Sequence, residues 1–410
     1  MKSIILLIML SNMATAKNYR EKIPGEYIVK SNKSHMGSVI RKLGKDLYLI
    51  KSQDKSIELK DDVFPNYKYI GNYLEKKIPA KNKEAKKEIE PLFINQFHHQ
   101  QIQTLKAWEQ TQGSTEVIVA VTDNEFEIDH DALKDSWWVN SREIPSNGID
   151  DDGNGYIDDI NGWNFIDKNA NPDSKEEFTH GTHIAGIIAA NTKSKTGISG
   201  IAPKVKVMAL RWYDYDAYWT TAIIVETYRY AVDNGARIIN TSYNIDQLVN
   251  DEAYLDVVQY IKNNGVLLVN SAGNSKTKDP ARGSIKDIIL VCSVTSQSIY
   301  GSDIKSAFSN YGKEIDICAP GDPILSTVQR RTSDGESRYG NSSGTSMASP
   351  VVAATAALVW SAHPNYSRDE VIRTILESTD EIDSKNKRKF RGLLGSGRVN
   401  VGRSISNKGI

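Results

Sequence analysis

Residues 205–210 read VKVMAL and residues 237–240 read RIIN, and the segment between them, Thr220 to Gly235, has helical character. The two short runs are mostly apolar, which is typical of strands that are covered on both faces. A strand, a helix and a second strand form the unit from which parallel sheets are built. This stretch therefore predicts an α/β fold with a parallel sheet.

The same pattern continues on both sides of this unit. Further apolar runs occur at residues 117–121 (VIVAV), 265–270 (GVLLVN) and 287–294 (DIILVCSV). We therefore expect residues 91–410 to form a three-layer α/β domain, with a mostly parallel central sheet and helices on both faces. Functional groups in such sheets collect beyond the carboxyl ends of the strands. The residues that follow these runs are thus the first candidates for a site.

Composition and charge narrow the class of protein. The 410-residue chain carries 51 basic and 51 acidic side chains, and 39% of it is hydrophobic. These values suit a globular protein and exclude a collagen, a coiled coil and a wholly disordered chain. A nucleic-acid-binding protein usually has a basic excess. We therefore expect no nucleic acid among the partners of this chain.

Residues 1–16 predict a secretory signal peptide. Lys2 precedes an apolar run at residues 4–10 (IILLIML), and Ala14-Thr15-Ala16 is a small-residue cleavage pattern. The run is too short to span a bilayer, and the cleavage pattern has no cysteine beside it for a lipid anchor. We expect a protein that is secreted to the periplasm or the extracellular medium, without a membrane anchor.

Residues 17–75 predict a small α+β domain, and residues 76–90 predict an exposed, charged linker. Strands are expected at residues 26–30 and 46–51. A helix is expected at residues 36–43, because Met36, Val39, Ile40 and Leu43 have the spacing of one helix face. The even spacing of Tyr67, Tyr69 and Tyr73 suits one face of a strand. Residues 17–90 carry 18 basic and 11 acidic side chains, whereas residues 91–410 carry 32 and 40. The two parts are therefore electrostatically complementary.

Three polar motifs accompany the apolar runs. Asp123 ends a buried strand predicted at residues 119–123 (VAVTD), His180 opens the motif HGTH, and Ser346 lies in GTSMASP ahead of a long apolar run. Asn274 follows another predicted strand and offers a side-chain amide. Taken singly, each residue also suits a cap or a buried polar contact.

Together these four residue types favour nucleophilic catalysis. A serine hydroxyl is a weak nucleophile unless a base takes its proton, and histidine, with a pKa near ~6.5, can do so. A buried carboxylate fixes the imidazole tautomer. At a helix N-terminus, Ser346 would lie where the helix dipole favours developing negative charge, and Asn274 would donate to the same oxyanion.

These residues resemble the subtilisin-like serine proteases, whose triad occurs in the order Asp, His, Ser. By residue match, Asp123, His180 and Ser346 resemble the triad, and Asn274 resembles the oxyanion-hole asparagine. The resemblance runs from Pro91 to Ile410 and includes residues 91–108, 306–312, the turn expected at 319–321, and 395–400. It implies a serine endopeptidase that cleaves protein or peptide substrates through an acyl-enzyme.

The family resemblance also gives residues 17–75 an expected role. Residues 64–67 (FPNY) resemble the end of subtilase prodomains. The resemblance implies a proenzyme whose own prodomain assists folding and acts as an intramolecular inhibitor. The charged segment before Pro91 is the expected processing site, because exposed polar segments are readily cleaved.

The sequence departs from the family next to two of these motifs. Asn124 and Glu125 follow the triad aspartate where the family has Ser or Thr and then Gly. The substrate-binding Ser-Leu-Gly appears as Ser242-Tyr243-Asn244. The resemblance assigns substrate binding to Ser242, Tyr243, Asn244, Ser271, Ala272 and Gly273. The departures leave open a non-catalytic peptide-binding pseudoprotease, and an esterase with the same triad is a further alternative.

A loop rich in Asp, Asn and Gly predicts a calcium site. Read from Asp150, its oxygen ligands follow the spacing of an EF-hand loop, although position 12 is Asn161. The expected ligands are Asp150, Asp152, Asn154, Tyr156 and Asp158. Calcium would then be a structural cofactor, and the alternative is an ordinary surface turn.

The remaining candidate residues have structural interpretations. We expect His130 and His183 to be packed side chains, and no Cys or carboxylate cluster accompanies His98 and His99 to indicate a metal. Cys292 and Cys318 have two alternative interpretations. They form a disulfide, which a secreted location permits, or they are two buried free thiols.

Overall fold

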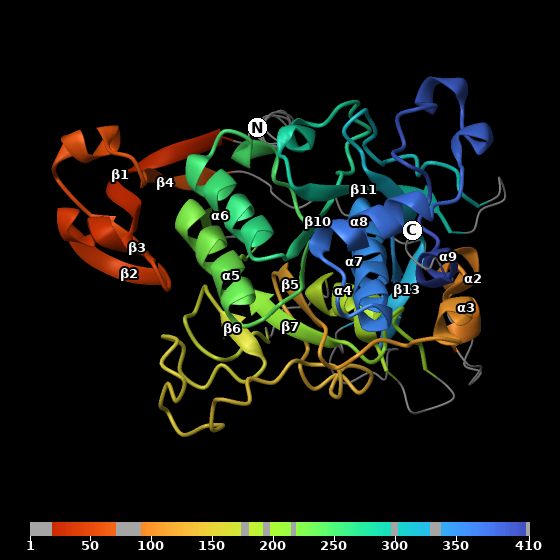
Figure 1. Cartoon of the computed structure of the whole chain (residues 1–410), viewed down its shortest axis with the longest axis horizontal. Coiled ribbons are helices and arrows are strands. Elements are labelled where there is room, and N and C mark those ends of the chain that lie inside the picture. The colour runs from red at the N-terminus through yellow and green to blue at the C-terminus, as the bar shows by residue number, and fades with distance from the viewer. Residues whose placement is uncertain are drawn as a thin grey trace, which may run out of the picture.

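The structure is a computed structural model of the chain. It describes residues 19–70, 92–173, 180–191, 197–214, 219–296, 302–328 and 338–406. The predicted signal peptide and charged linker, together with Tyr73, lie outside the described residues. Figure 1 shows the N-terminal strands on one side of a larger body of strands and helices.

A parallel sheet forms the centre of the larger body, as predicted. In the described residues it has seven strands in the order β12-β11-β10-β9-β5-β7-β6, and each neighbouring pair is parallel. The strands are β5 (Ile118–Asp123), β6 (Gly162–Asn164), β7 (Lys206–Arg211), β9 (Ile238–Thr241), β10 (Leu267–Ser271), β11 (Ile288–Thr295) and β12 (Ile317–Asp322). The five predicted apolar strands are confirmed. The turn expected at residues 319–321 is wrong, because these residues continue the edge strand β12.

Helices cover both faces of this sheet, which completes the three-layer fold (Figure 1). The helices on these faces include α4 (His180–Ala189), α5 (Thr221–Asp233), α6 (Glu252–Asn263) and α7 (Thr345–Ala362). Along β10, Leu267 and Val269 pack with α4 and α7, whereas Leu268 packs with α5 and α6. This alternation follows from the two-residue period of a strand.

The remaining helices and one strand pair are as follows. The helices are α2 (Phe97–Gln101), α3 (Thr104–Trp108), α8 (Arg368–Glu377) and α9 (Val401–Ser406), and β13 (Ile324–Thr327) pairs with β14 (Tyr339–Ser342). The 3₁₀ helices of the described chain are η2 (Ser31–Met36), η3 (Lys55–Leu59), η4 (Leu92–Asn95), η5 (Asp246–Leu248), η6 (Ala281–Ser284), η7 (Asp383–Lys385) and η8 (Arg388–Phe390). Among the described helices, α7 alone is long and apolar enough to cross a membrane, and 89% of it is buried inside the protein.

The described N-terminal residues form an antiparallel sheet that continues into the larger body. Its order is β2-β3-β1-β4-β8. The strands are β1 (Tyr19–Lys30), β2 (Ser38–Gly44), β3 (Leu47–Lys51), β4 (Val63–Ile70) and β8 (Trp219–Thr220). β8 belongs to the larger body and pairs with β4 through Lys68 with Thr220 and Tyr69 with Trp219.

The helix predicted around residues 36–43 is wrong, and the described residues 19–70 form four strands and two 3₁₀ helices. Residues 38–44 form β2, whose pairing with β3 shifts register twice. These irregularities break the two-residue alternation that would have indicated a strand. Val39 and Ile40 are 53% and 48% exposed, so the helical spacing did not mark a buried face.

Ion pairs join the two parts, and they include basic groups of the N-terminal part as well as a basic group of the larger body. The N-terminal sheet packs on α5 and α6 (Figure 1). Arg41 lies 2.8 Å from the buried carboxylate of Glu226, and Arg229 pairs with Asp46. Tyr69 stacks on Trp219 with ring centroids 4.3 Å apart.

Candidate active site

Asp123, which is buried, and His180, which is partly exposed, form a pair at the carboxyl end of β5. Nδ1 of His180 lies 2.9 Å from each carboxylate oxygen of Asp123, which is fully buried. The backbone N–H of Asn124 and the hydroxyl of Tyr213 donate to the same carboxylate at 2.8 Å and 3.3 Å. A carboxylate at Nδ1 holds the proton there and leaves Nε2 as the basic nitrogen.

Gly181 explains why these two side chains meet. A Cβ atom at this position would lie 2.2 Å from the carbonyl oxygen of Glu125 and 3.0 Å from Cβ of Asp123. Only glycine therefore allows the first turn of α4 to approach the end of β5 this closely. Glu125, which replaces a glycine that the family has after the triad aspartate, is buried beside this turn.

Pro350 and Ser242 fix the first turn of α7, which carries Ser346. Proline has no N–H, so Pro350 cannot donate to the carbonyl of Ser346 four residues earlier. The hydroxyl of Ser242 donates to that carbonyl instead, at 2.9 Å. Asn240 donates to the same hydroxyl at 3.0 Å and accepts from Ser349 of α7 at 2.8 Å. These contacts hold the start of α7 against the end of β9.

The strand register brings the two halves of the site to one edge. β5 and β9 are neighbours, and Thr122 is opposite Thr241. Asp123 is the last residue of β5, and Ser242 is the first residue after β9. Adjacent strands lie about 4.8 Å apart, so the two residues are neighbours. His180 contacts Asp123, and the hydroxyl of Ser346 donates to the carbonyl of Ser242 at 3.0 Å. The predicted triad residues thus lie along two neighbouring strand ends.

Asn274 and the first turn of α7 surround a common point. The side-chain oxygen of Asn274 accepts from the backbone N–H and the hydroxyl of Thr345, at 2.9 Å and 3.0 Å. A Cβ atom at Gly344 would lie 3.3 Å from Nδ2 of Asn274 and 3.6 Å from the backbone nitrogen of Ser346. Because residue 344 is glycine, no side chain occupies this point, which also lies 3.6 Å from the sulfur of Met347.

The predicted substrate-binding segments lie at the same edge, but several of their side chains point into the core. Tyr243 is 1% exposed, and its hydroxyl lies 3.1 Å from the Thr122 hydroxyl and 2.7 Å from the Tyr228 hydroxyl. Ser271 and Ala272 are also fully buried. Asn244 is partly exposed. The side chain of Tyr243 is therefore a core group, and not part of a pocket.

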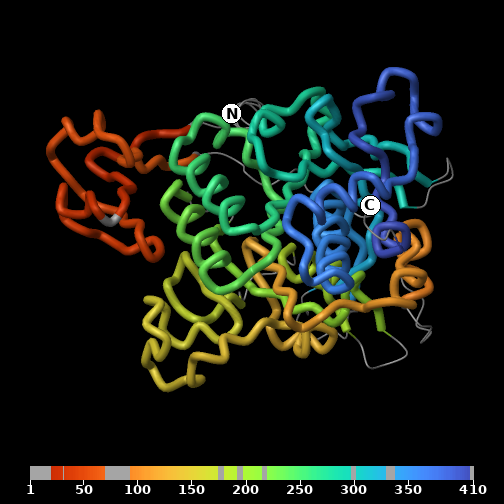
Figure 2. The backbone as a smooth tube through the Cα atoms, in the orientation of Figure 1, coloured from red at the N-terminus to blue at the C-terminus, as the bar shows by residue number. Residues whose placement is uncertain are grey.

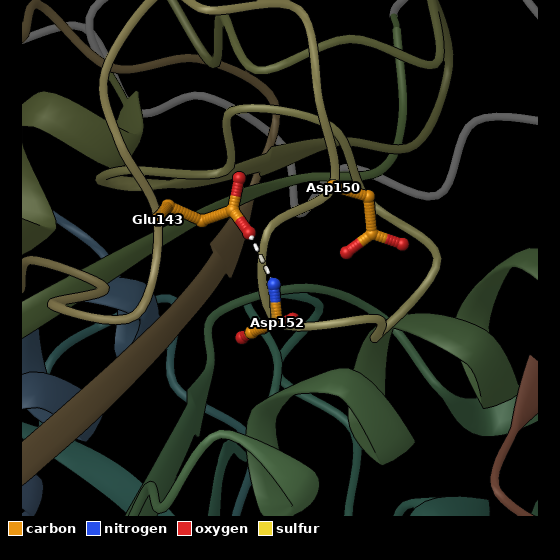
Figure 3. A group of neighbouring side chains, drawn as sticks. All are labelled: Glu143, Asp150 and Asp152. Carbon is orange, nitrogen blue, oxygen red and sulfur yellow. Dashed lines mark hydrogen bonds between the residues drawn. The ribbon is translucent and has the colours of Figure 1, made fainter.

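The acidic loop gathers three carboxylates, one of which the sequence analysis missed. Glu143, Asp150 and Asp152 offer oxygen atoms that lie within 4.8 Å of one another (Figure 3). Glu143 also accepts from the backbone N–H of Asp152 at 3.0 Å. An all-oxygen set fits a hard cation such as Ca²⁺. Arg142, 2.9 Å from Asp152, partly neutralises the same cluster.

The other predicted ligands have different partners. The carboxylate of Asp158 accepts from the backbone N–H groups of Asn147 and Gly148, both at 3.0 Å. The side-chain oxygen of Asn154 accepts from the N–H of Tyr156 at 2.7 Å. The loop packs against α5 (Figure 2), where the hydroxyl of Tyr156 donates to Glu226 at 3.2 Å.

The remaining candidates are structural. Cys292 and Cys318 are opposite each other on β11 and β12 and form a disulfide. His130 and His183 are buried and contact backbone carbonyls, as expected for packed side chains. Within the described ranges, His98 and His99 take part in no group of three metal-ligating side chains.

Comparisons with known proteins agree with this geometry. A model of the subtilase family matches residues 114–397. A thermophilic serine proteinase of Bacillus sp. (strain AK1) is 34% identical over 290 residues, which are 70% of this chain and 62% of that protein. Thermitase of Thermoactinomyces vulgaris is 31% identical over 318 residues, which are 77% of this chain and 98% of thermitase. The chain thus spans less than two thirds of the first relative and nearly all of the second.

Two solved structures share the fold. Fervidolysin from Fervidobacterium pennivorans, described as a keratinolytic enzyme related to subtilisin, has a TM-score of 0.68 at 21% identity, over 94% of this chain and 61% of its own. A lanthipeptide protease has a TM-score of 0.58 at 26% identity, over 75% of this chain and 93% of its own. Because the match to fervidolysin covers 94% of this chain, it extends into the N-terminal sheet as well.

Proposed function

The chain belongs to the subtilase family, and from this premise we propose that it is a serine endopeptidase with Asp123, His180 and Ser346 as its triad. The observation that carries the proposal is the contact of His180 with both oxygens of the buried Asp123. That contact selects the tautomer that a general base needs.

The proposed reaction is acyl transfer to Ser346. The hydroxyl of Ser346 leaves the carbonyl of Ser242, gives its proton to Nε2 of His180 and attacks the peptide carbonyl. His180 then protonates the leaving amine, and water hydrolyses the acyl-enzyme by the reverse proton transfers. Asn274 and the backbone N–H of Ser346 stabilise the oxyanion in the space beside Gly344.

The N-terminal sheet is the proposed prodomain. It contacts α5 and α6 and continues into β8, and its charge complements that of the larger body. We propose secretion as a proenzyme, cleavage in the charged linker and inhibition by the docked sheet. Sequencing the N-terminus of the mature protein tests this proposal, and a start at Lys17 would contradict it.

Calcium is the proposed structural cofactor of the acidic loop. Glu143, Asp150 and Asp152 would hold it, and Arg142 would lose part of its pairing to Asp152 when the ion binds. The ion would supply positive charge that relieves the repulsion among the three carboxylates and so stabilises the loop. No step of peptide hydrolysis depends on it.

Labelling with a fluorophosphonate tests the proposed activity. We expect the wild type to gain one covalent adduct at Ser346, and Ser346→Ala to gain none. Ser361→Ala is a matched control in the same helix, because the Ser361 hydroxyl donates within α7, to the carbonyl of Ala357 at 2.7 Å. A folded, processed wild type that is not labelled would contradict the proposal and favour the non-catalytic peptide-binding alternative.

A further inference from the structure

Arg282 is a buried cation that the proposed mechanism does not use. It lies in η6 and is 1% exposed. Its Nε and Nη2 atoms donate to the two carboxylate oxygens of Asp246 at 2.9 Å and 3.1 Å, and Nη2 also donates to the side-chain oxygen of Asn244 at 2.6 Å. Nη1 donates to the carbonyls of Ser271 at 2.7 Å and Tyr243 at 3.4 Å.

These acceptors come from two different strand ends. Tyr243, Asn244 and Asp246 follow β9, and Ser271 ends β10. A Cβ atom at Gly273 would lie 2.3 Å from Nδ2 of Asn310 and 3.3 Å from Nη2 of Arg282, so both side chains pack against the residue that precedes Asn274. One side chain thus joins the segment that follows β9 to the segment that leads to the oxyanion donor.

The geometry of arginine is what makes this link rigid. A guanidinium presents its N–H groups in a planar fork, so Asp246, Asn244 and Ser271 are held at fixed angles to one another. A lysine ammonium in the same place would supply charge without the fork. Burying an unpaired cation is costly, and the carboxylate of Asp246 compensates that cost.

The position of the fork relates it to the substrate. If Asn274 binds the carbonyl of the cleaved bond, the substrate residue that carries this carbonyl lies beside residues 271–273. Asn244, which is partly exposed, follows the neighbouring strand β9 and is joined to Ser271 through Arg282. The separation of these two segments then sets the width of the space for that substrate side chain.

We propose that Arg282 is a positioning residue that sets the spacing of the segments after β9 and β10, and thereby the preference for the substrate residue immediately before the cleaved bond. The proposal rests on the proposed protease function. We call the group formed by Arg282, Asp246 and Asn244 the wall between the two segments. Since Asp246 neutralises Arg282, this wall is polar without net charge. Removal of the Asp246 charge would expose the positive potential of Arg282 to an acidic substrate side chain.

The test compares a small probe with extended peptides. Methanesulfonyl fluoride carries only a methyl group, which is too small to fill the space for that substrate side chain, so its rate reports on Ser346 and His180. A set of peptides that differ only at the residue before the cleaved bond reports on the wall. For Arg282→Met we expect the ratio of kcat/KM between best and worst peptide to fall about tenfold, with a raised KM, while the probe rate changes much less. Arg282→Lys should restore little of the selectivity.

Two further variants keep the proposal falsifiable if Arg282→Met does not fold. Asp246→Asn should shift the preference toward Asp and Glu by about fivefold or more. Asn244→Ala should reduce selectivity with the Arg282–Asp246 pair intact. The matched control is Arg403→Met, which removes an exposed arginine that bonds to Thr379 and Asp380 rather than to residues of these segments.

The outcomes separate the two proposals. Unchanged peptide preferences in these variants, or peptide and probe rates that fall in parallel, would overturn the role of Arg282. A wild type that reacts with neither the probe nor any peptide would instead contradict the protease function itself.

Discussion

Ser242 and Ser346 exchange two hydrogen bonds: the Ser242 hydroxyl donates to the Ser346 carbonyl at 2.9 Å, and the Ser346 hydroxyl donates to the Ser242 carbonyl at 3.0 Å. The first bond replaces the helix bond that Pro350 cannot make. The second holds the proposed nucleophile at the end of β9 in the resting structure. The placement of Ser346 therefore depends on Ser242 as well as on α7.

Replacement of Ser242 by alanine should destabilise the protein. The carbonyl of Ser346 would be buried without a partner, because Pro350 has no N–H to offer. An unsatisfied buried acceptor costs about 1–3 kcal/mol. We expect this loss in the free energy of unfolding of Ser242→Ala, measured by urea titration in a Ser346→Ala background to prevent self-digestion. Ser361→Ala serves as the control, and equal stability of the two variants would contradict this role of Ser242.

Gly344→Ala should impair catalysis with little effect on folding. The added methyl group would occupy the point 3.3 Å from Nδ2 of Asn274 and 3.6 Å from the nitrogen of Ser346. In subtilisin, after which the family is named, loss of one oxyanion-hole donor lowers kcat by about 10²–10³-fold. We expect Gly344→Ala to lose at least this much and Asn274→Ala to lose a similar amount. A Gly344→Ala variant with wild-type kcat would show that the oxyanion lies elsewhere.

The central sheet was predictable because its strands are buried on both faces and are therefore nearly continuous apolar runs. β6 was missed because it has only three residues. β12 was missed because Pro320 and Gly321 are typical of turns, and both are tolerated here at the edge of the sheet.

The site was predictable where local motifs carry it, and missed where it depends on distant segments. His180 and Ser346 lie in distinctive motifs. Glu143 lies seven residues before Asp150, and only the folded loop brings the two carboxylates together. Arg282 lies 38 residues after Asn244, and nothing in its local sequence indicates the contact. The core position of the Tyr243 side chain likewise depends on Thr122 and Tyr228 from other elements.

Removal of one carboxylate should weaken the calcium response of the acidic loop. We expect calcium to raise the Tm of the wild type relative to a chelator, because an ion bound only to the folded state stabilises it. Glu143→Gln should lose most of this shift, since it removes one of three charges that face the ion. Asp151→Asn is the control from the same loop, outside the cluster of three. The same Tm with calcium and with chelator in the wild type would count against the site.

Buried histidines should make the protein less stable in acid. Burial lowers the pKa of His99 to about 4 and of His183 to about 3, and it lowers the pKa of His98 well below its usual value. In the unfolded chain these groups bind protons below pH ~6.5. Through these histidines the unfolded state takes up more protons than the folded state between pH ~6.5 and ~4, so their contribution to stability falls as the pH is lowered through this window.

The slope of stability against pH tests this interpretation. Each such histidine contributes up to about 1.4 kcal/mol per pH unit. We expect His99→Gln, which can still donate to the carbonyl of Ser199, to reduce the slope by about one proton, measured by urea titration between pH 7 and pH 5. An equal slope in wild type and His99→Gln would contradict the assignment.

The intact mass of the secreted wild type beside Ser346→Ala tests the central claim most directly. Both proteins are expressed in a protease-poor host. If the triad is active and cuts its own prodomain, only the wild type loses the residues up to the linker at 76–90, and Ser346→Ala retains them. If both proteins keep these residues, or both lose them alike, the claim that this chain is a self-processing serine protease is contradicted.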